Sequence, residues 1–303
     1  MWVNDQPKSK YALVMCASNG YLPGVNATIN SMDYYGNKLD LHFIHDDILP
    51  EGYWDEIKKA KLNYRLVMQN FSSQFDKFIK LYPKLYPNVF QYWSYLRYWY
   101  MAQIKDDYDA VGLFDGDQIL LNDITPWFEL VSGTKYILAA QHIFHDFAAE
   151  NYNEEIMNSV QPICNLPLIG DPKIWSEVYI HMCEREQTEH EADMDCFNKS
   201  TYLCGKWKDI IEVLDCQWNC GYVWRGTLRK LIIKSGKEFL IGVPNTFRVY
   251  AIHNKWWQEG FRNAHCAKNS PDKERMSINL DLIFGMYKKF NLEYKVKYDF
   301  LNL

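Results

Sequence analysis

The sequence predicts a single α/β domain built on a mainly parallel central sheet flanked by helices, and three observations support this prediction. Short apolar runs alternate with helical patterns through residues 1–125. No internal repeat or low-complexity linker divides the 303 residues of the chain. Two acidic residues, Asp115 and Asp117, directly follow the fourth apolar run. Strands that alternate with helices usually form parallel sheets, which bind their ligands at the carboxyl ends of the strands.

The first half of the chain contains the regular alternation. Its four apolar runs have the length of buried strands and occupy residues 11–17, 39–45, 64–68 and 110–114. Helical patterns lie between them at residues 25–32, 54–61 and 89–105. The order βαβαβαβ therefore predicts a layered sheet with its main ligand site at the carboxyl edge.

The organisation changes after Asp117, and the periodicity weakens beyond residue 145. Further short strands are predicted at residues 119–121, 136–140 and 239–243. Further helices are predicted from Thr125 onward and at residues 174–185, 191–198 and 277–290. Because no linker separates the two halves, we expect one domain whose rear half shapes the site for a second substrate.

Composition and charge narrow the class of protein. Hydrophobic residues make up 48% of the chain and charged residues 23%, which is typical of a globular domain. The net charge is −5 without a long block of like charge, so a nucleic-acid-binding surface is not indicated. The 8 cysteines show no CxxC pair, which favours free thiols and a reducing, cytoplasmic setting. Residues 1–10 are polar and no apolar run approaches the ~20 residues of a membrane span, so no anchor is expected.

The strongest candidate for a chemical site is Asp115-Gly116-Asp117. In a regular strand the two carboxylates would point to opposite faces, but the chain turns here, and Gly116 is expected to permit a bend that other residues resist. Both acids can then bind one Mg²⁺ or Mn²⁺ ion that also holds a diphosphate. The alternative from these three residues alone is a polar turn between two strands.

Three further segments stand in a fixed order around the acidic pair. They are Cys16-Ala17-Ser18-Asn19-Gly20-Tyr21, Tyr95-Leu96-Arg97-Tyr98-Trp99 and Val249-Tyr250-Ala251-Ile252-His253-Asn254-Lys255-Trp256-Trp257. With the acidic pair, this order resembles the nucleotide-sugar glycosyltransferases of the GT-A fold, most closely the family-eight, glycogenin-like group. The resemblance covers most of the chain. It implies a Rossmann-like GT-A domain with a smaller acceptor-side subregion, in which residues 1–125 bind the nucleotide sugar and residues 126–303 shape the acceptor site.

The resemblance implies a nucleoside site at the end of the first strand. Ala17, Ser18, Asn19 and Tyr21 would surround the nucleoside, with Tyr21 stacking on a uracil through its aromatic plane. Arg97 would approach the phosphate or sugar of the donor and act in catalysis, because its guanidinium stays charged and can bind two oxygens at once. The alternatives are a simple turn around Tyr21 and a surface arginine on an amphipathic helix.

The resemblance also implies a complete metal site. Asp115 and Asp117 would bind the metal and the ribose, with Gly116 in contact with the donor, and His253 would be the third metal ligand. Lys255 would bind the diphosphate. This chain departs from the family at that point, since the family usually has Gly between the two residues and a Lys-Pro-Trp ending, where this chain has His-Asn-Lys-Trp-Trp.

Two more acids, Asp193 and Asp195, lie in a stretch that resembles the acidic helix start of the family. The resemblance implies that they face the donor sugar as catalytic residues and hold its hydroxyls by hydrogen bonds. The alternative is that both are acids at a helix start, where the helix dipole favours negative charge.

These assignments predict a metal-dependent hexosyltransferase. It would use Mn²⁺ or Mg²⁺ to move a sugar from a UDP-sugar to an acceptor hydroxyl, and the resemblance implies retention of the anomeric configuration. A nucleotidyltransferase acting on a sugar phosphate and a non-catalytic carbohydrate-binding protein are the alternatives. The sequence lacks the P-loop motif, which argues against a P-loop enzyme. The acceptor stays open, and a glycan or a modified nucleic-acid base both fit.

Overall fold

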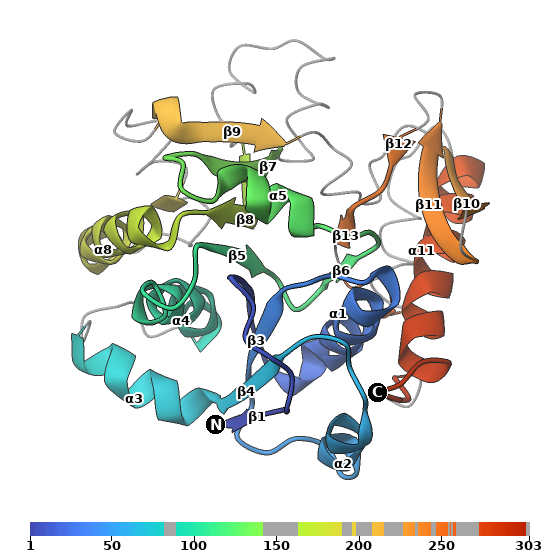
Figure 1. The fold of residues 1–303 in the computed structure, drawn as a ribbon, viewed down its shortest axis with the longest axis horizontal. Coiled ribbons are helices and arrows are strands. Elements are labelled where there is room, and N and C mark those ends of the chain that lie inside the picture. Colours follow the sequence, from blue (N-terminus) through green and yellow to red (C-terminus); the bar gives the residue numbers. More distant parts are fainter. Residues whose placement is uncertain are drawn as a thin grey trace.

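The computed structural model describes most of the chain. The described residues are 1–81, 89–141, 163–189, 196–197, 208–214, 227–233, 236–243, 247–253, 255, 257–258 and 273–300. Within them, strands and helices alternate through the first half as the sequence predicts (Figure 1). No helix in these ranges is both long and apolar enough to cross a membrane.

Across the described residues the main sheet has eight strands in the order β1-β4-β3-β2-β5-β8-β7-β9. In chain order these are β1 (Trp2–Val3), β2 (Tyr11–Ala17), β3 (Asp40–His45), β4 (Leu66–Asn70), β5 (Ala110–Phe114), β7 (Ile137–Gln141), β8 (Ile163–Gly170) and β9 (Ile211–Leu214). The four central strands β4, β3, β2 and β5 are parallel, whereas β1 and β8 are antiparallel to their central neighbours. Farther out, β7 is antiparallel to β8 and parallel to β9. The predicted mainly parallel sheet is therefore confirmed.

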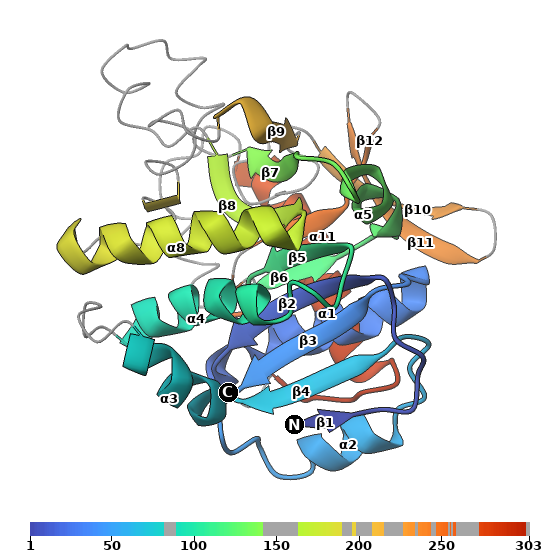
Figure 2. The same ribbon diagram turned by 60° about the vertical axis from the view of Figure 1, so that its left-hand side comes forward.

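Helices cover both faces of this sheet (Figures 1 and 2). The elements are α1 (Leu22–Tyr35), α2 (Tyr53–Lys59), α3 (Phe71–Leu81), α4 (Val89–Gln103), α5 (Thr125–Val131), α8 (Pro172–Glu189) and α11 (Lys273–Leu292), with short 3-10 turns η1 (Asn19–Tyr21) and η3 (Lys208–Ile210). In Figure 1 α3, α4 and α8 lie to the left of the sheet, and α1 and α11 lie to its right. The sheet is thus buried on both faces, which explains why β2 and β5 are nearly continuous apolar runs.

Strand β2 shows how the two faces are filled. Val14 and Cys16 point into the core cluster shared with α4 and α8. Leu13 and Met15 point into the cluster shared with α1, α2 and α5. Because side chains alternate along a strand, one short run supplies both hydrophobic cores.

Several elements are absent from the sequence-based prediction. Helix α3 is one of them, although Phe71, Phe75 and Phe78 have the spacing of the apolar face of an amphipathic helix. Strands β8 and β9 are others, and they extend the sheet beyond β5. The helix predicted at residues 191–198 lies outside the described residues except for 196–197.

A third layer lies behind α1. It contains α11 and the antiparallel strands β10 (Thr227–Ile233), β11 (Lys237–Val243) and β12 (Phe247–Arg248). Strand β13 (Ala251–His253) leaves this layer and pairs with β6 (Gln118–Leu120), which follows the acidic pair. The carboxyl-terminal part of the chain therefore returns to the carboxyl edge of the central sheet.

Candidate active site

The acidic pair stands on a tight turn between β5 and β6. Gln118 closes this turn twice, because its backbone N–H donates to the carbonyl of Asp115 and its side-chain oxygen accepts from the Asp115 N–H at 2.9 Å. Tyr287, on α11, donates a hydrogen bond from its hydroxyl to the Asp117 carbonyl at 2.9 Å. The backbone that carries both carboxylates is thus fixed by hydrogen bonds within the turn and by one hydrogen bond from the last helix.

Gly116 has a different role from the one that the sequence predicts. The expectation was a bend that other residues resist, but among the described glycines those with positive φ are Gly36, Gly52, Gly133 and Gly236. A Cβ atom at Gly116 would instead lie 2.6 Å from the Cβ atom of Ala17 and 2.9 Å from that of Tyr21. Glycine is needed here because β2 and its following loop pack directly against the turn.

The first turn of helix α1 packs against the same acidic turn. A Cβ atom at Gly24 would lie 2.0 Å from the carbonyl oxygen of Gly116, so the first turn of α1 also requires a glycine. The Leu-Pro-Gly sequence after Tyr21 therefore opens α1 and also fits the helix against the acidic turn.

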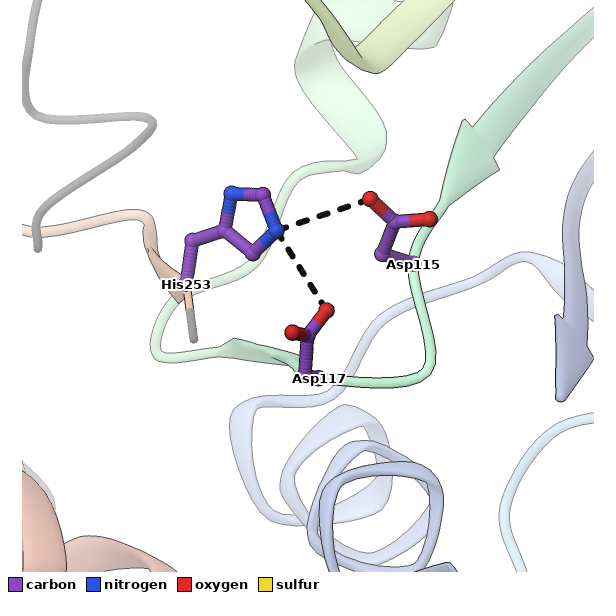
Figure 3. Close-up of side chains that lie close together, drawn as sticks. All are labelled: Asp115, Asp117 and His253. Atoms are coloured by element: carbon purple, nitrogen blue, oxygen red, sulfur yellow. Dashed lines mark ion pairs between the residues drawn. The ribbon is translucent and has the colours of Figure 1, made fainter. Parts of the chain in front are cut away.

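His253 reaches the site through strand pairing. In the antiparallel β13–β6 pair, His253 lies opposite Gln118 and Ile252 lies opposite Ile119. This register places His253 across from the residue that follows Asp117, although His253 and Asp117 are far apart in sequence. The Nε2 atom of His253 lies 3.5 Å from Asp115 Oδ2 and 3.3 Å from Asp117 Oδ1 (Figure 3).

Asp115, Asp117 and His253 form a candidate metal centre. Their ligand atoms all lie within 4.8 Å of one another, and Figure 3 shows both carboxylates directed toward the imidazole. Two carboxylates and one imidazole suit a divalent cation such as Mn²⁺, which accepts both oxygen and nitrogen ligands. The three side chains are each partly exposed, so further ligands from a bound substrate have access.

Arg97, on α4, forms an ion pair with Asp115 through Nη1. Burial raises the pKa of the Asp115 carboxyl, but the Arg97 charge and the His253 hydrogen bond outweigh it and hold that pKa well below its usual range. Asp115 is therefore a carboxylate at neutral pH and is ready to bind a cation. Arg97 is itself buried, with its guanidinium 5.6 Å from the Tyr98 ring centroid.

The three candidate ligands lie in the wall of a cavity of about 240 Å³. Its lining combines the end of β2, one face of α4, the acidic turn and β13. The lining residues are Cys16, Ala17, Ser18, Tyr21, Trp93, Ser94, Arg97, Asp115, Gly116, Asp117 and His253. The structure thus brings together eight of the residues that the sequence singles out as site residues.

The remaining predicted site residues have other surroundings. Asn19 is not among the cavity residues. Its side-chain amide donates to the carbonyl of Ile48 at 2.9 Å and joins two loops. Lys255 places its Nζ atom 4.1 Å from the centroid of the Tyr21 ring and covers one face of that ring. Asp193 and Asp195 lie outside the described residues.

Three cavity residues are absent from the predicted site, namely Cys16, Trp93 and Ser94. Trp93 and Ser94 could have been found by helical spacing, since residues three and four positions before Arg97 share its face of α4. Burial raises the pKa of the Cys16 thiol, which therefore stays neutral beside Arg97. Its signal in the sequence is only its place at the end of β2.

The sequence model of glycosyl transferase family 8 matches residues 12–238, more than half of the chain. Comparison with curated proteins found no match. Among solved structures, galactosyltransferase LgtC in complex with donor and acceptor sugar analogs has a TM-score of 0.54 at 15% identity, over 92% of this chain and 95% of that one.

Two other solved structures have a similar fold. The apo bifunctional glycosyltransferase WbbM has a TM-score of 0.54 at 15% identity, over 90% of this chain and 52% of that one. Apo GlyE of Streptococcus pneumoniae TIGR4 has a TM-score of 0.52 at 15% identity, over 96% of this chain and 65% of that one. At such identities these similarities concern the fold.

The architecture is that of the GT-A glycosyltransferases, as the sequence resemblance implies. Within that class, the chain belongs to glycosyl transferase family 8. It is therefore a glycosyltransferase, and the candidate metal centre lies where a parallel α/β sheet binds its ligands, at the carboxyl ends of its strands.

Proposed function

We propose that this glycosyltransferase moves a hexose from a UDP-sugar to an acceptor hydroxyl with the help of a divalent cation. The observation that carries the proposal is the cluster of Asp115, Asp117 and His253 in the wall of one cavity. When bound, a Mn²⁺ or Mg²⁺ ion would neutralise the charge that develops on a leaving diphosphate. The three residues would hold that ion and leave its other positions to phosphate oxygens and water.

The other cavity residues would bind the nucleoside and the diphosphate of the donor. Tyr21, beside Ala17 and Ser18, supplies an aromatic surface and polar atoms for the nucleoside. Arg97 orients Asp115 and keeps it ionised, and its buried positive charge lies close to the place of the diphosphate. Lys255 is near enough to the cavity wall, through Tyr21, to serve as a second cation for the diphosphate.

We further propose that the transfer retains the anomeric configuration, as family membership favours. The bond from the anomeric carbon to the diphosphate oxygen breaks, and a bond to the acceptor oxygen forms on the same face of the sugar. The proton of the acceptor hydroxyl passes to an oxygen of the leaving diphosphate. Anomeric coupling constants in the NMR spectrum of the product test this directly, and an inverted linkage would refute it.

The proposed donor can be identified before the acceptor is known. A panel of UDP-sugars is incubated with the protein and MnCl₂, and release of UDP is measured with and without EDTA. We expect slow, metal-dependent hydrolysis of one donor or a few. If no UDP-sugar is hydrolysed or bound, the assignment of a UDP-sugar donor is wrong.

The metal role predicts a specific loss in two variants. Asp115→Asn or Asp117→Asn should lower metal-dependent hydrolysis by roughly a hundredfold or more, because each removes a charged ligand from the site. The control is Asp76→Asn, which changes an exposed acid on α3. Titration with MnCl₂ provides the second measurement, and unchanged manganese affinity in both cavity variants would contradict the metal role.

A further inference from the structure

Trp93 lines the cavity but is part of neither the proposed metal site nor the proposed nucleoside site. It lies on α4 one turn before Arg97, and both side chains line the cavity together with Ser94. We propose that the Trp93 indole is the platform on which the sugar ring of the donor stacks, and that it selects the donor. The proposal rests on the proposed use of a UDP-sugar.

The indole is held from behind by other rings. Trp93 stacks on Phe71 with ring centroids 3.9 Å apart and an interplanar angle of 29°. Phe71 stacks in turn on Phe75 at 5.2 Å and 16°. These rings pack against the core that α4 shares with the sheet. A ring held in this way offers a fixed surface to a ligand, so little conformational entropy is lost on binding.

The position of Trp93 assigns it to the sugar end of the donor. In a nucleotide sugar the diphosphate joins the nucleoside to the sugar, and in the proposed function the metal centre holds the diphosphate. Ala17 and Tyr21 lie against Gly116 on one side of the acidic turn. Arg97 meets Asp115 from α4, which packs on the opposite face of β2 from Ala17 and Tyr21. If the nucleoside lies by Tyr21, the sugar extends toward α4 and reaches Trp93.

The chemistry of this wall suits a hexose. One face of a hexose ring carries mainly C–H groups, which pack against the flat apolar body of an indole. The hydroxyls at its edge need polar partners, and Ser94 and Arg97 stand next to Trp93 on the same helix face. An aromatic surface with a few polar groups beside it is the usual composition of a small-molecule site.

The test compares the binding of UDP with that of UDP-sugars. Affinities for UDP, UDP-glucose, UDP-galactose and UDP-N-acetylglucosamine are measured by calorimetry in MgCl₂ for the wild type, Trp93→Leu and Trp93→Phe. We expect Trp93→Leu to weaken the tightest UDP-sugar roughly tenfold and to leave UDP within about twofold, because a lost aromatic contact is worth up to about that factor. Trp93→Phe, which keeps a ring, should recover most of the loss.

A matched control removes an indole elsewhere. Trp54 is also partly buried and packs on Trp2, away from the cavity, so Trp54→Leu should bind both ligands as the wild type does. Saturation-transfer NMR gives a second readout in Mg²⁺. Transfer to the hexose protons should fall in Trp93→Leu relative to transfer to the uracil protons.

The outcomes separate the inference from the proposed function. Equal weakening of UDP and UDP-sugar would overturn the inference, because Trp93 would then hold the nucleoside. Unchanged affinity for both ligands would overturn it as well. A wild-type protein that binds neither UDP nor any UDP-sugar would instead refute the proposed donor, and the inference with it.

Discussion

At the scale of single residues, close approach explains the candidate site better than backbone conformation does. The sequence marks Asp115-Gly116-Asp117 as a site, and the two acids do converge on His253. It does not reveal why glycine stands between them, because the reason is the proximity of Ala17, far away in sequence. A contact between distant segments leaves no local signal.

This proximity predicts the effect of a small substitution. Gly116→Ala should lower the free energy of unfolding by about 1–3 kcal/mol, because the new methyl group overlaps with Ala17 and Tyr21. It should also weaken UDP binding, since Tyr21 would be displaced. Chemical denaturation and calorimetry measure the two effects.

The control lies in the neighbouring loop. A Cβ atom at Gly20 meets nothing within 4 Å, so Gly20→Ala should change the unfolding free energy by less than about 0.5 kcal/mol. Equal effects of the two substitutions would show that crowding at Gly116 is not the cause.

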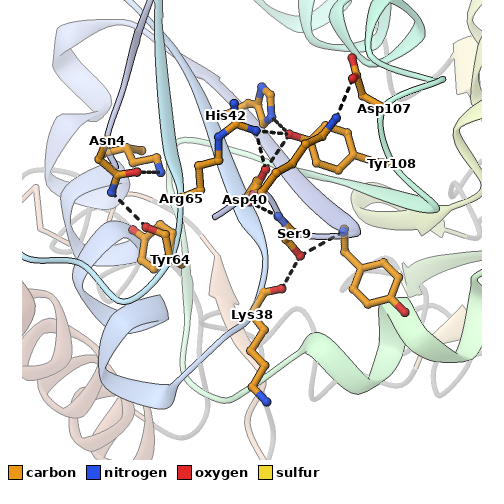
Figure 4. Close-up of polar contacts among 12 residues, drawn as sticks. Asn4, Ser9, Lys38, Asp40, His42, Tyr64, Arg65, Asp107 and Tyr108 are labelled. Atoms are coloured by element: carbon orange, nitrogen blue, oxygen red, sulfur yellow. Dashed lines mark hydrogen bonds and ion pairs between the residues drawn. The ribbon is translucent and has the colours of Figure 1, made fainter. Parts of the chain in front are cut away.

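At the scale of elements, a buried hydrogen-bond network joins α4 and the segment after it to the sheet. His42, on β3, lies between the hydroxyls of Tyr100 at 2.8 Å and Tyr108 at 2.7 Å. The Tyr108 hydroxyl donates to Asp40 at 2.7 Å, and Arg65 pairs with Asp40 at 3.1 Å (Figure 4). Because Tyr100 is on the same helix as Arg97, this network helps to fix the helix that faces the cavity.

These bonds fit a neutral imidazole. Tyr108 donates its proton to Asp40, so its oxygen accepts from Nε2–H of His42. The other ring nitrogen is then left to accept from Tyr100. Burial, followed by the charge of Arg65, lowers the pKa of His42 to about 3.

The lowered pKa predicts a pH dependence of stability. Between pH 6.5 and about 3 the unfolded state carries a proton on His42 that the folded state lacks, so stability falls as the pH falls. The contribution of this one residue approaches about 1.4 kcal/mol per pH unit. Chemical denaturation at pH 7, 6 and 5 should therefore give a shallower dependence for His42→Gln than for the wild type. Parallel curves would contradict the assignment.

The sequence predicts most strands and helices of the first half, but it does not predict the hydrogen-bond network around His42. The strand that contains His42 is predicted from the alternating pattern of residues 39–45, and its end at His45 is confirmed. That His42 is a buried, neutral link to Tyr100 and Tyr108 follows only from the packing of α4 on β3 and β2. The sequence-based prediction lacks helix α3, although Phe71 of that helix stacks on Trp93.

At the scale of the whole molecule, the candidate metal centre joins two distant parts of the chain. Asp115 and Asp117 follow a central strand, whereas His253 arrives on β13 from the carboxyl-terminal layer. Tyr287 adds a bond from α11 to the acidic turn. A ligand bound at this junction should therefore stabilise the entire fold.

This junction predicts linkage between ligand binding and thermal stability. With the metal site saturated by MnCl₂ in all samples, UDP at about a hundred times its dissociation constant should raise the midpoint of thermal unfolding by roughly 5 °C, since this one ligand adds about 2.7 kcal/mol. His253→Ala should lose most of this increase. His181→Ala on α8, outside the cavity lining, should keep it. An unchanged increase in His253→Ala, measured by calorimetry, would exclude His253 from the site.

The sequence by itself determined the α/β class, the order of the first strands and helices, and the acidic pair at the end of β5. These features follow from local periodicity and from the chemistry of neighbouring residues. The tertiary structure alone decided that His253 completes the cluster in space, that Gly116 is needed for close packing, and that Trp93 faces the same cavity as the acids. Each of these depends on strand register or helix packing between distant segments, which local sequence does not encode.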